Sequence, residues 1–257
     1  MEITESQYER IADCLPRQRG NVSMTNLQLL NALLYVAEHG CKWRGLPKHL
    51  GNWHTVYTRM NRWSKAGVLD RVFARLQAEQ ILAIRIEGVC LDSTTIKVHP
   101  DGTGALKSDP QSIGRSRGGN TTKIHLVAAN ARCALSVALS PGNAGDAPQG
   151  RELLRNGGAV PAGCPLIMDR AYKGDETLQL ARTLGYLPVV PPNNNRLVPW
   201  EYDRVLYRRR NEIERLFRRL KAYRRVFSRF DKLDVLFVGF IVFALIFEAL
   251  RFSVNTL

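Results

Sequence analysis

The spacing of apolar positions along the chain changes near residue 86. Before it, apolar residues recur every three or four positions, a pattern that predicts helices over residues 25–39, 52–66 and 69–84. Glycines between these segments mark turns. After residue 86, short apolar runs bounded by polar residues predict strands. The pattern therefore predicts a small all-helical N-terminal domain over 1–85 and a second domain over 86–257.

The second domain mixes strands and helices. A predicted hairpin comes first, and helices then alternate with strands, an order that indicates an α/β domain with a mixed sheet. The last of these helices is long and basic and is expected over 201–225. The predicted strands lie at 89–91, 123–129, 133–139, 165–168 and 186–190, and the other helices at 147–156 and 175–184.

One apolar stretch follows the basic helix. It runs over residues 235–247 and contains Gly239. A membrane-spanning helix needs roughly 20 apolar residues, so this stretch favours a helix buried in protein. The polar, acidic start MEITESQYER is unlike a signal peptide. We therefore expect a cytoplasmic protein that has no membrane partner.

Charge narrows the choice of partner. The net charge is +14 and the isoelectric point about 10.0. Residues 204–232 alone hold 12 basic and three acidic side chains. Such an excess points to a polyanion, either nucleic acid or an anionic membrane surface. The membrane alternative rests only on this segment and the apolar stretch, and nucleic acid is the better interpretation.

Two aspartates follow short apolar runs. Asp92 follows Val89–Leu91 in VCLDSTT, and Asp169 follows the predicted strand 165–168 in LIMDRAY. Strand ends hold carboxylates rigidly, as ligands of paired divalent ions in phosphoryl transfer must be held. Taken singly, an aspartate in this position is more often a turn former or a helix cap.

The basic helix offers a third acid. At about 100° per residue, the polar residues Tyr207, Arg210, Glu214 and Lys221 all fall within one stripe. The apolar Ile213, Leu216, Phe217 and Leu220 form the opposite, buried face. Glu212 points away from the stripe, so Glu214 is the acid that can join Asp92 and Asp169. The alternative is a solvated basic face with an ordinary ion pair between Arg210 and Glu214.

These residues resemble the DDE transposases of bacterial insertion sequences, in the insertion-sequence-four and -five superfamily. The family signature is Tyr, two residues, Arg, three residues, Glu, six residues, Lys, and Tyr207, Arg210, Glu214 and Lys221 match it without deviation. The insertion-sequence-five branch is also resembled by LDSTTIKVH, GRSRGGNTTKIHLV, MDRAYKGD, RRRNEIERLFRRLK and the N-terminal WRGLPKHLGNWHTVYTRMNRWSKAG. The resemblance covers most of the chain.

The resemblance implies an RNase H-like catalytic fold, a mixed sheet flanked by helices. It implies Mg²⁺, with Mn²⁺ as a substitute, held by Asp92, Asp169 and Glu214. The implied reaction is a two-metal hydrolysis at transposon ends followed by transfer of the freed 3′-OH into target DNA. The implied partners are double-stranded DNA, both terminal inverted repeats and target, and a second copy in a synaptic homodimer. Such a protein is associated with the nucleoid.

Several basic groups are candidates for DNA contact. The 52–66 helix is either the recognition helix of a helix-turn-helix or part of a plain bundle, and the loop 107–123 is either a phosphate-binding loop or a linker. His99 and His125 stay outside the predicted ligand set. The predicted DNA-contact residues are Arg59, Arg62 and Lys65, then Arg115, Arg117 and Lys123, and finally Tyr207, Arg210 and Lys221.

Two other functions remain compatible with the sequence. A junction-resolving or RNA–DNA hybrid nuclease can share the fold, and strand joining in vitro distinguishes it from a transposase. A DNA-binding protein descended from a transposase can have lost its chemistry, and a metal-dependent nicking assay tests this alternative. The intact set of three acids favours the enzyme.

Overall fold

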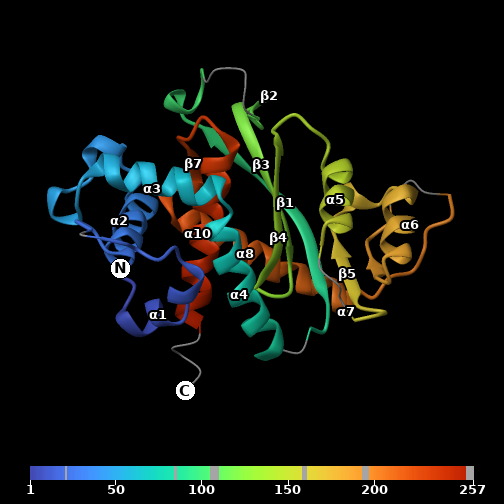
Figure 1. Cartoon of the computed structure of the whole chain (residues 1–257). Helices are drawn as coiled ribbons and strands as arrows, with labels where there is room; N and C mark the ends of the chain where they lie inside the picture. Colours follow the sequence, from blue (N-terminus) through green and yellow to red (C-terminus); the bar gives the residue numbers. More distant parts are fainter. Residues whose placement is uncertain (21, 84–85, 105–109, 158–160, 193–196, 253–257) are drawn as a thin grey trace. The chain divides into compact units, whose positions relative to one another are not determined.

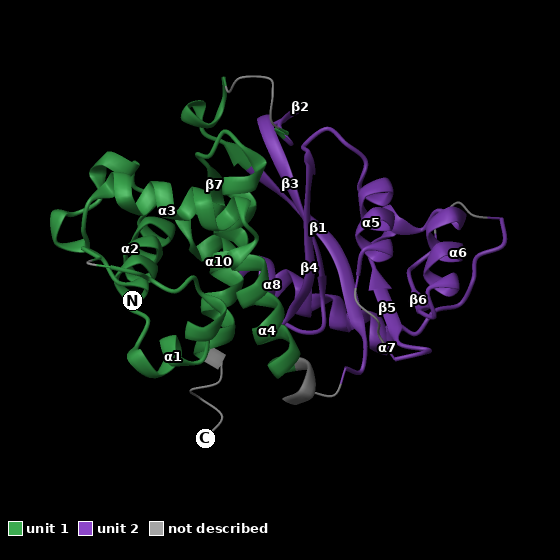
Figure 2. Ribbon diagram, in the orientation of Figure 1, with its two compact units in different colours: residues 1–80, 97–111, 219–257 green, residues 81–96, 112–218 purple. Residues whose placement is uncertain are grey.

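The computed structural model describes residues 1–257 except 21, 84–85, 105–109, 158–160, 193–196 and 253–257 (Figure 1). The chain forms two compact units (Figure 2). Unit 1 contains Met1–Gln80, Lys97–Gln111 and Arg219–Leu257, and unit 2 contains Ile81–Ile96 and Ser112–Arg218. Both units are therefore assembled from segments that are far apart in the sequence.

Helices build unit 1. The three helices predicted from periodicity are confirmed as α2 (Asn26–His39), α3 (Trp53–Lys65) and α4 (Val68–Ala83). Helix α2 starts at a capping box in which the Thr25 side chain and Gln28 satisfy each other's backbone amides. It ends at Gly40, whose φ of 64° suits glycine. A short helix that periodicity did not predict, α1 (Glu5–Glu9), precedes them.

The apolar stretch near the C-terminus forms α10 (Asp234–Phe252). Phe237, Phe240, Phe243 and Phe247 are at most 2% exposed. A helix that is apolar on all sides must be enclosed by protein, and α10 packs against α2 and α3 within unit 1. Gly239 permits a close approach, because an added Cβ would lie 2.3 Å from the Ser64 hydroxyl. Among the described residues, no helix is both long and apolar enough to cross a bilayer.

A mixed sheet forms the centre of unit 2. Strand β1 (Val89–Val98) lies between β3 (Gly119–Ala128) and β5 (Pro165–Met168). Beyond β3 lie its antiparallel partners β2 (Gly114–Ser116) and β4 (Ala134–Pro141), and beyond β5 lies the parallel β6 (Leu187–Val189). An antiparallel hairpin on one side of β1 and parallel strands on the other confirm the predicted mixed sheet.

Helices flank this sheet. Helix α5 (Asp146–Arg155) packs on β3 and β4, and α6 (Asp175–Thr183) packs on β6 (Figure 1). The core between them holds Leu91, Leu153, Leu166, Met168 and Tyr172, each at most 4% exposed. This packing fixes Leu91 on β1 and Met168 at the end of β5. These two residues directly precede Asp92 and Asp169.

Strand β1 is longer than predicted. The prediction ended the strand at Leu91, but the β-branched run after Asp92 continues it to Val98. Asp92 is therefore the fourth residue of a ten-residue strand. The last two residues of β1 belong to unit 1, where Lys97 and Val98 pair with β7 (Ser228–Arg229), a strand that the sequence did not predict.

The basic helix is interrupted. It was predicted as one helix over 201–225, but it consists of α7 (Arg204–Tyr207), a 3₁₀ turn (Arg208–Arg210), α8 (Asn211–Ala222) and α9 (Arg224–Phe227). Asp203 caps α7 by accepting from the amides of Val205 and Leu206. The 3₁₀ turn advances about 120° per residue, so the stripe calculated with 100° per residue is not continuous between Tyr207 and Glu214.

The compact units do not follow a boundary at residue 85. Unit 1 also takes in residues 97–111 and 219–257, because α10 supplies much of its apolar interior.

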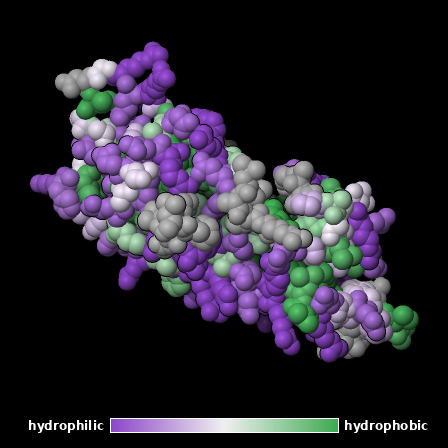
Figure 3. All heavy atoms as spheres, turned by 90° about the horizontal axis from the view of Figure 1, so that it is seen from below, coloured by the Kyte–Doolittle hydropathy of each residue, from purple (hydrophilic) through white to green (hydrophobic). Residues whose placement is uncertain are grey.

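One face of the molecule is predominantly hydrophilic with small apolar areas, in keeping with the high charge (Figure 3). The remaining short 3₁₀ turns are Ala12–Cys14, Trp43–Gly45, Lys48–Leu50, Pro100–Gly102 and Arg170–Tyr172.

Candidate active site

Asp92 and Asp169 lie side by side in unit 2. The parallel strands β1 and β5 pair Leu91 with Met168; Asp92 is the next residue on β1, and Asp169 directly follows the end of β5. Asp92 accepts a hydrogen bond from the Ser93 amide at 2.8 Å, and Asp169 accepts one from the Arg170 amide at 2.6 Å. The register of the two strands, rather than loop geometry, therefore brings the two carboxylates together.

Arg210 connects Asp92 to Glu214. One guanidinium nitrogen lies 2.8 Å from Asp92 Oδ2, and another lies 2.5 Å from Glu214 Oε1. The negative charge of Asp169 acts on Arg210 as well, since that carboxylate is among the causes that raise the arginine's pKa. Asp92 and Glu214 thus bond to one guanidinium, and the third predicted acid, Asp169, acts on it through its charge.

The electrostatics of the site disfavour three full negative charges. Burial, with smaller contributions from the negative charges of Asp169 and Glu214, raises the pKa of Asp92 to about 6 against the opposing effects of the Ser93 amide and Arg210. The Asp92 side chain is only 13% exposed, whereas that of Glu214 is 34% exposed. A cation added to this group would lower the cost of ionising Asp92.

A second layer of polar contacts, which the sequence did not reveal, supports Asp92. The Ser93 hydroxyl donates to Asp146 Oδ1 at 3.0 Å, and the Lys123 ammonium donates to the same oxygen at 2.8 Å. Lys123 also donates to the Ala144 carbonyl. Asp146 directly precedes the predicted helix 147–156 and belongs to no recognisable catalytic spacing, so the sequence carries no signal for it.

The donor set suits a hard divalent cation, because carboxylate oxygens are the ligands that Mg²⁺ and Mn²⁺ prefer. Among the residues that the structure describes, however, no three His, Cys, Asp or Glu side chains lie close enough to hold one ion. Arg210 instead bonds to two of the three acids. The chemistry of the residues fits the metal, and a direct three-ligand geometry is not formed.

Glu212 lies apart from the three acids. Its Oε2 accepts a hydrogen bond from the Ala131 amide at 3.0 Å, in the turn between β3 and β4. This placement agrees with the helical projection, which separated Glu212 from Glu214. It makes Glu212 a matched comparison for Glu214, with the same charge on the same helix and a different environment.

The basic residues of unit 2 are placed unequally. Arg115 and Arg117 are exposed on β2 and the turn that follows it. Lys123 is held inward by Asp146, with a side chain only 15% exposed, so it has little freedom to reach DNA. Tyr207 is half-buried and packs edge-on against Tyr202. In the predicted 107–123 loop, residues 107–109 lie outside the described residues.

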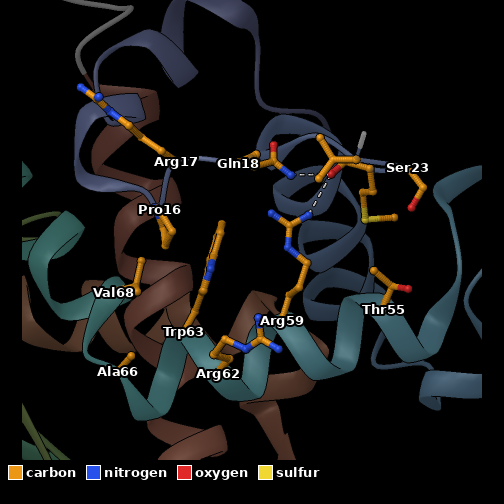
Figure 4. A pocket seen from close by; sticks show the side chains of 12 residues that line it. Pro16, Arg17, Gln18, Ser23, Thr55, Arg59, Arg62, Trp63, Ala66 and Val68 are labelled. Carbon is orange, nitrogen blue, oxygen red and sulfur yellow. Dashed lines mark hydrogen bonds between the residues drawn. The ribbon is translucent and has the colours of Figure 1, made fainter. Parts of the chain in front are cut away.

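In unit 1, the predicted DNA contacts of α3 differ in exposure, and Figure 4 shows two of them, Arg59 and Arg62. Arg59 is turned into internal bonds, donating to the Met24 carbonyl at 3.0 Å and to the Asn26 side chain. Arg62 and Lys65 are exposed. Trp63 beside them is 3% exposed, as expected for a core residue. Arg59 thus braces the α2 start, whereas the other two cations remain accessible.

Neither histidine considered earlier joins the acids. His125 is fully buried, and its ring lies 2.8 Å from the Ser140 hydroxyl. Burial lowers the pKa of His125 to about 4, so it is neutral near pH 7. His99 belongs to unit 1 and stacks on Phe230. Leaving both outside the ligand set agrees with these positions.

Comparison with known proteins places this site in a family. Residues 84–246 match the model described as "Transposase DDE domain", and residues 3–73 match the one described as "Putative transposase of IS4/5 family". The first match covers more than half of the chain. The chain therefore belongs to the DDE transposases of insertion sequences.

Two curated relatives match parts of the chain. One is "Putative transposase for insertion sequence element IS6501" from Brucella ovis, which is 34% identical over 122 residues, 47% of this chain and 92% of the relative. The other is "Uncharacterized protein y4sN" from Sinorhizobium fredii, 34% identical over 109 residues, 41% of this chain and 84% of the relative. Each relative spans less than half of this chain.

Solved transposase structures are similar at a coarser level. A piggyBac transposase synaptic complex with hairpin DNA has a TM-score of 0.38 and 10% identity, covering 77% of this chain and 49% of that one. A pre-cleavage Mos1 transpososome has a TM-score of 0.27 and 11% identity, covering 67% and 61%. The chain thus spans about half to three fifths of these proteins. The family assignment rests on the family models and not on these scores.

Proposed function

We propose that this transposase cuts DNA at the ends of an insertion sequence and then joins the freed 3′-OH to target DNA. The observation that carries the proposal is the register of β1 and β5, which sets Asp92 beside Asp169 with Glu214 in reach of the same guanidinium. Three acids with one basic partner make a site that attracts cations and suits phosphoryl transfer.

Asp92, Asp169 and Glu214 are proposed to hold Mg²⁺ or Mn²⁺. The bound metal would supply Lewis-acid activation of the attacking oxygen and stabilise the leaving oxygen. The chain's own residues position the acids and offset the repulsion among them. The strand register holds Asp92 and Asp169, the Ser93 amide orients Asp92, and Arg210 offsets repulsion among the three carboxylates. If the three acids held a cation, Arg210 would be free to contact a phosphate.

The DNA partner is double-stranded and includes terminal repeats and target. Arg115 and Arg117 on unit 2, together with Arg62 and Lys65 on unit 1, are exposed cations suited to phosphate contact. Residues 1–85 are proposed to contain the end-recognising part, and two copies are proposed to pair the two ends. The protein is then associated with the nucleoid in the cytoplasm.

Glu214→Gln tests the central assignment. The substitution keeps the shape of the side chain and removes its charge, so we expect nicking of DNA carrying the element's ends to be lost with either Mg²⁺ or Mn²⁺. Binding of the same DNA, measured by fluorescence anisotropy, should stay within about twofold. Glu212→Gln is the matched control, and it should nick at close to the wild-type rate.

The outcomes separate the alternatives. Normal nicking by the Glu214→Gln protein would falsify the assignment of this acid. A wild-type protein that binds DNA but never nicks it with any divalent ion points to a binding protein that has lost its chemistry. Nicking without joining of the 3′-OH to a second duplex points to a nuclease on the same fold.

A further inference from the structure

Unit 1 contains a surface hollow whose lining is basic and aromatic. Its volume is about 600 Å³, and the residues that line it come from the end of α2, the end of α8, and α9 with the strand that follows. None of the lining residues is an Asp or a Glu. The basic and aromatic ones are His39, Lys221, Arg224, Phe227 and Phe230. A hollow with this composition suits a ligand that is both anionic and flat.

The two cations have no acidic partner in the part of the chain that the structure describes. Lys221 is half-buried and Arg224 is exposed, and neither side chain forms an ion pair or hydrogen bond there. Burial lowers the pKa of Lys221, and no carboxylate acts to raise it. A half-buried ammonium left uncompensated gains from an anion such as a phosphate group.

Phe227 is the aromatic component. It is 60% exposed, and every other aromatic residue in the described part of the chain is well below that value. Within the hollow, this ring presents a flat apolar face beside two cations. A nucleobase offers a flat face that can stack on the ring while its phosphate meets the cations.

Gly40 allows the end of α2 to pack closely against α9 at one wall of the hollow. Its φ of 64° suits glycine, and an added Cβ would lie 2.9 Å from the Arg224 Cβ. A larger residue at this position would push α9 outward and shift Phe227. The end of α2 and the helix α9 thus pack closely against each other. The hollow beside them is defined by this packing in unit 1.

We propose that this hollow binds an unpaired nucleotide of the DNA substrate, with its base stacked on Phe227 and its phosphates held by Lys221 and Arg224. The proposal rests on the proposed function only in taking DNA as the ligand. Inside duplex DNA, a phenyl ring finds no free base face, because each base is covered by its neighbours in the stack. The hollow therefore distinguishes unpaired from paired DNA.

Fluorescence anisotropy tests this distinction on the full-length protein without divalent metal. The two probes are a labelled single strand of about 12 nucleotides and a blunt duplex of the same length. Phe227→Ala should weaken binding of the single strand about tenfold, within the range measured for base–aromatic stacking, and change duplex binding less than about twofold. Phe227→Tyr keeps the ring and should restore tight binding of the single strand.

The matched control is Leu187→Ala, which removes an apolar side chain of similar exposure, 57%, from unit 2. It should leave both affinities unchanged. The proposal is overturned if Phe227→Ala leaves single-strand binding within about twofold, or weakens both probes equally. Nicking by the wild-type protein is measured in parallel, so a failure of the proposed cutting activity is recognised separately from a failure of this binding site.

Discussion

Arginine side chains contact carboxylates in two regions of this molecule, and the two clusters differ in their balance of positive and negative charge. In unit 1, Arg225 grips Asp231 with two bonds of 3.0 and 2.8 Å, and Arg229 bonds to Asp234 at 2.7 Å. Two cations meet two anions there. In unit 2, two acids bond to Arg210 alone, and a third, Asp169, acts on it through its charge.

Burial differs in the same direction. The Arg225 side chain is 4% exposed and that of Arg229 is fully buried, whereas Glu214 in the acidic cluster is 34% exposed. Arg225 also lies over the rings of Trp43, Phe230 and Phe240 at 5.2 to 5.3 Å. A neutral and enclosed cluster stabilises the fold, whereas an unbalanced and accessible cluster has capacity left for a cation.

Removing one of the two arginines of the balanced cluster should have the largest effect on stability. Arg225→Ala leaves Asp231 charged and enclosed, so we expect the free energy of unfolding to fall by about 3–5 kcal/mol. Urea unfolding monitored by circular dichroism measures the loss. Arg218→Ala, at an exposed position on α8, is the control and should change stability by less than about 0.5 kcal/mol. Equal, small losses in both variants would contradict the structural role of the balanced cluster.

The contacts behind Asp92 should affect activity more than stability. Asp146→Asn weakens the hold on Lys123 and on the Ser93 hydroxyl, so we expect nicking to slow about tenfold through a misplaced Asp92. Lys123→Met should slow it similarly, and the double variant should be little worse than either single one. Fully additive losses in this cycle would show that the two residues act independently.

Protonation of Asp92 should produce the smallest effect on stability, and its effects on stability and on activity are opposite in sign. Its pKa is raised from 3.8 to about 6, so the stabilising effect of protonation is complete below pH 3.8 and is lost as pH rises through 6. At pH 7.5, Asp92→Asn should therefore raise stability by on the order of 1 kcal/mol while abolishing nicking.

Wild-type nicking should in turn fall as pH drops below about 6, because metal ligation needs the ionised carboxylate. Thermal unfolding at pH 7.5 and at pH 5 checks the first part, since the advantage of the Asn variant should shrink at the lower pH. A variant that is less stable than wild type at both pH values would contradict the raised pKa of Asp92.

Much of this arrangement could be predicted from the sequence, because periodicity and spacing report local structure. The three N-terminal helices, the hairpin and the strand before Asp169 were all predicted, and Glu214 was separated from Glu212 by helical phase. The register that pairs Leu91 with Met168 could not be predicted, since it depends on contacts between residues 77 positions apart.

Other features escaped prediction for physical reasons. The 3₁₀ turn at Arg208–Arg210 has no distinct residue preference, so a regular helix was expected there. Lys123 and Arg59 look like DNA contacts in a basic sequence, but Asp146 and the Met24 carbonyl hold them inward. Charge composition does not show which cations have found an internal partner.

The construction of unit 1 has a consequence for synthesis. Helices α2 and α3 are made well before α10, which packs against both but begins only at Asp234. The N-terminal helices therefore cannot complete their apolar interior until α10 has been synthesised. A nascent chain stalled before that point exposes the surfaces that α10 later covers, which makes it a substrate for chaperones rather than a competent DNA-binding fragment.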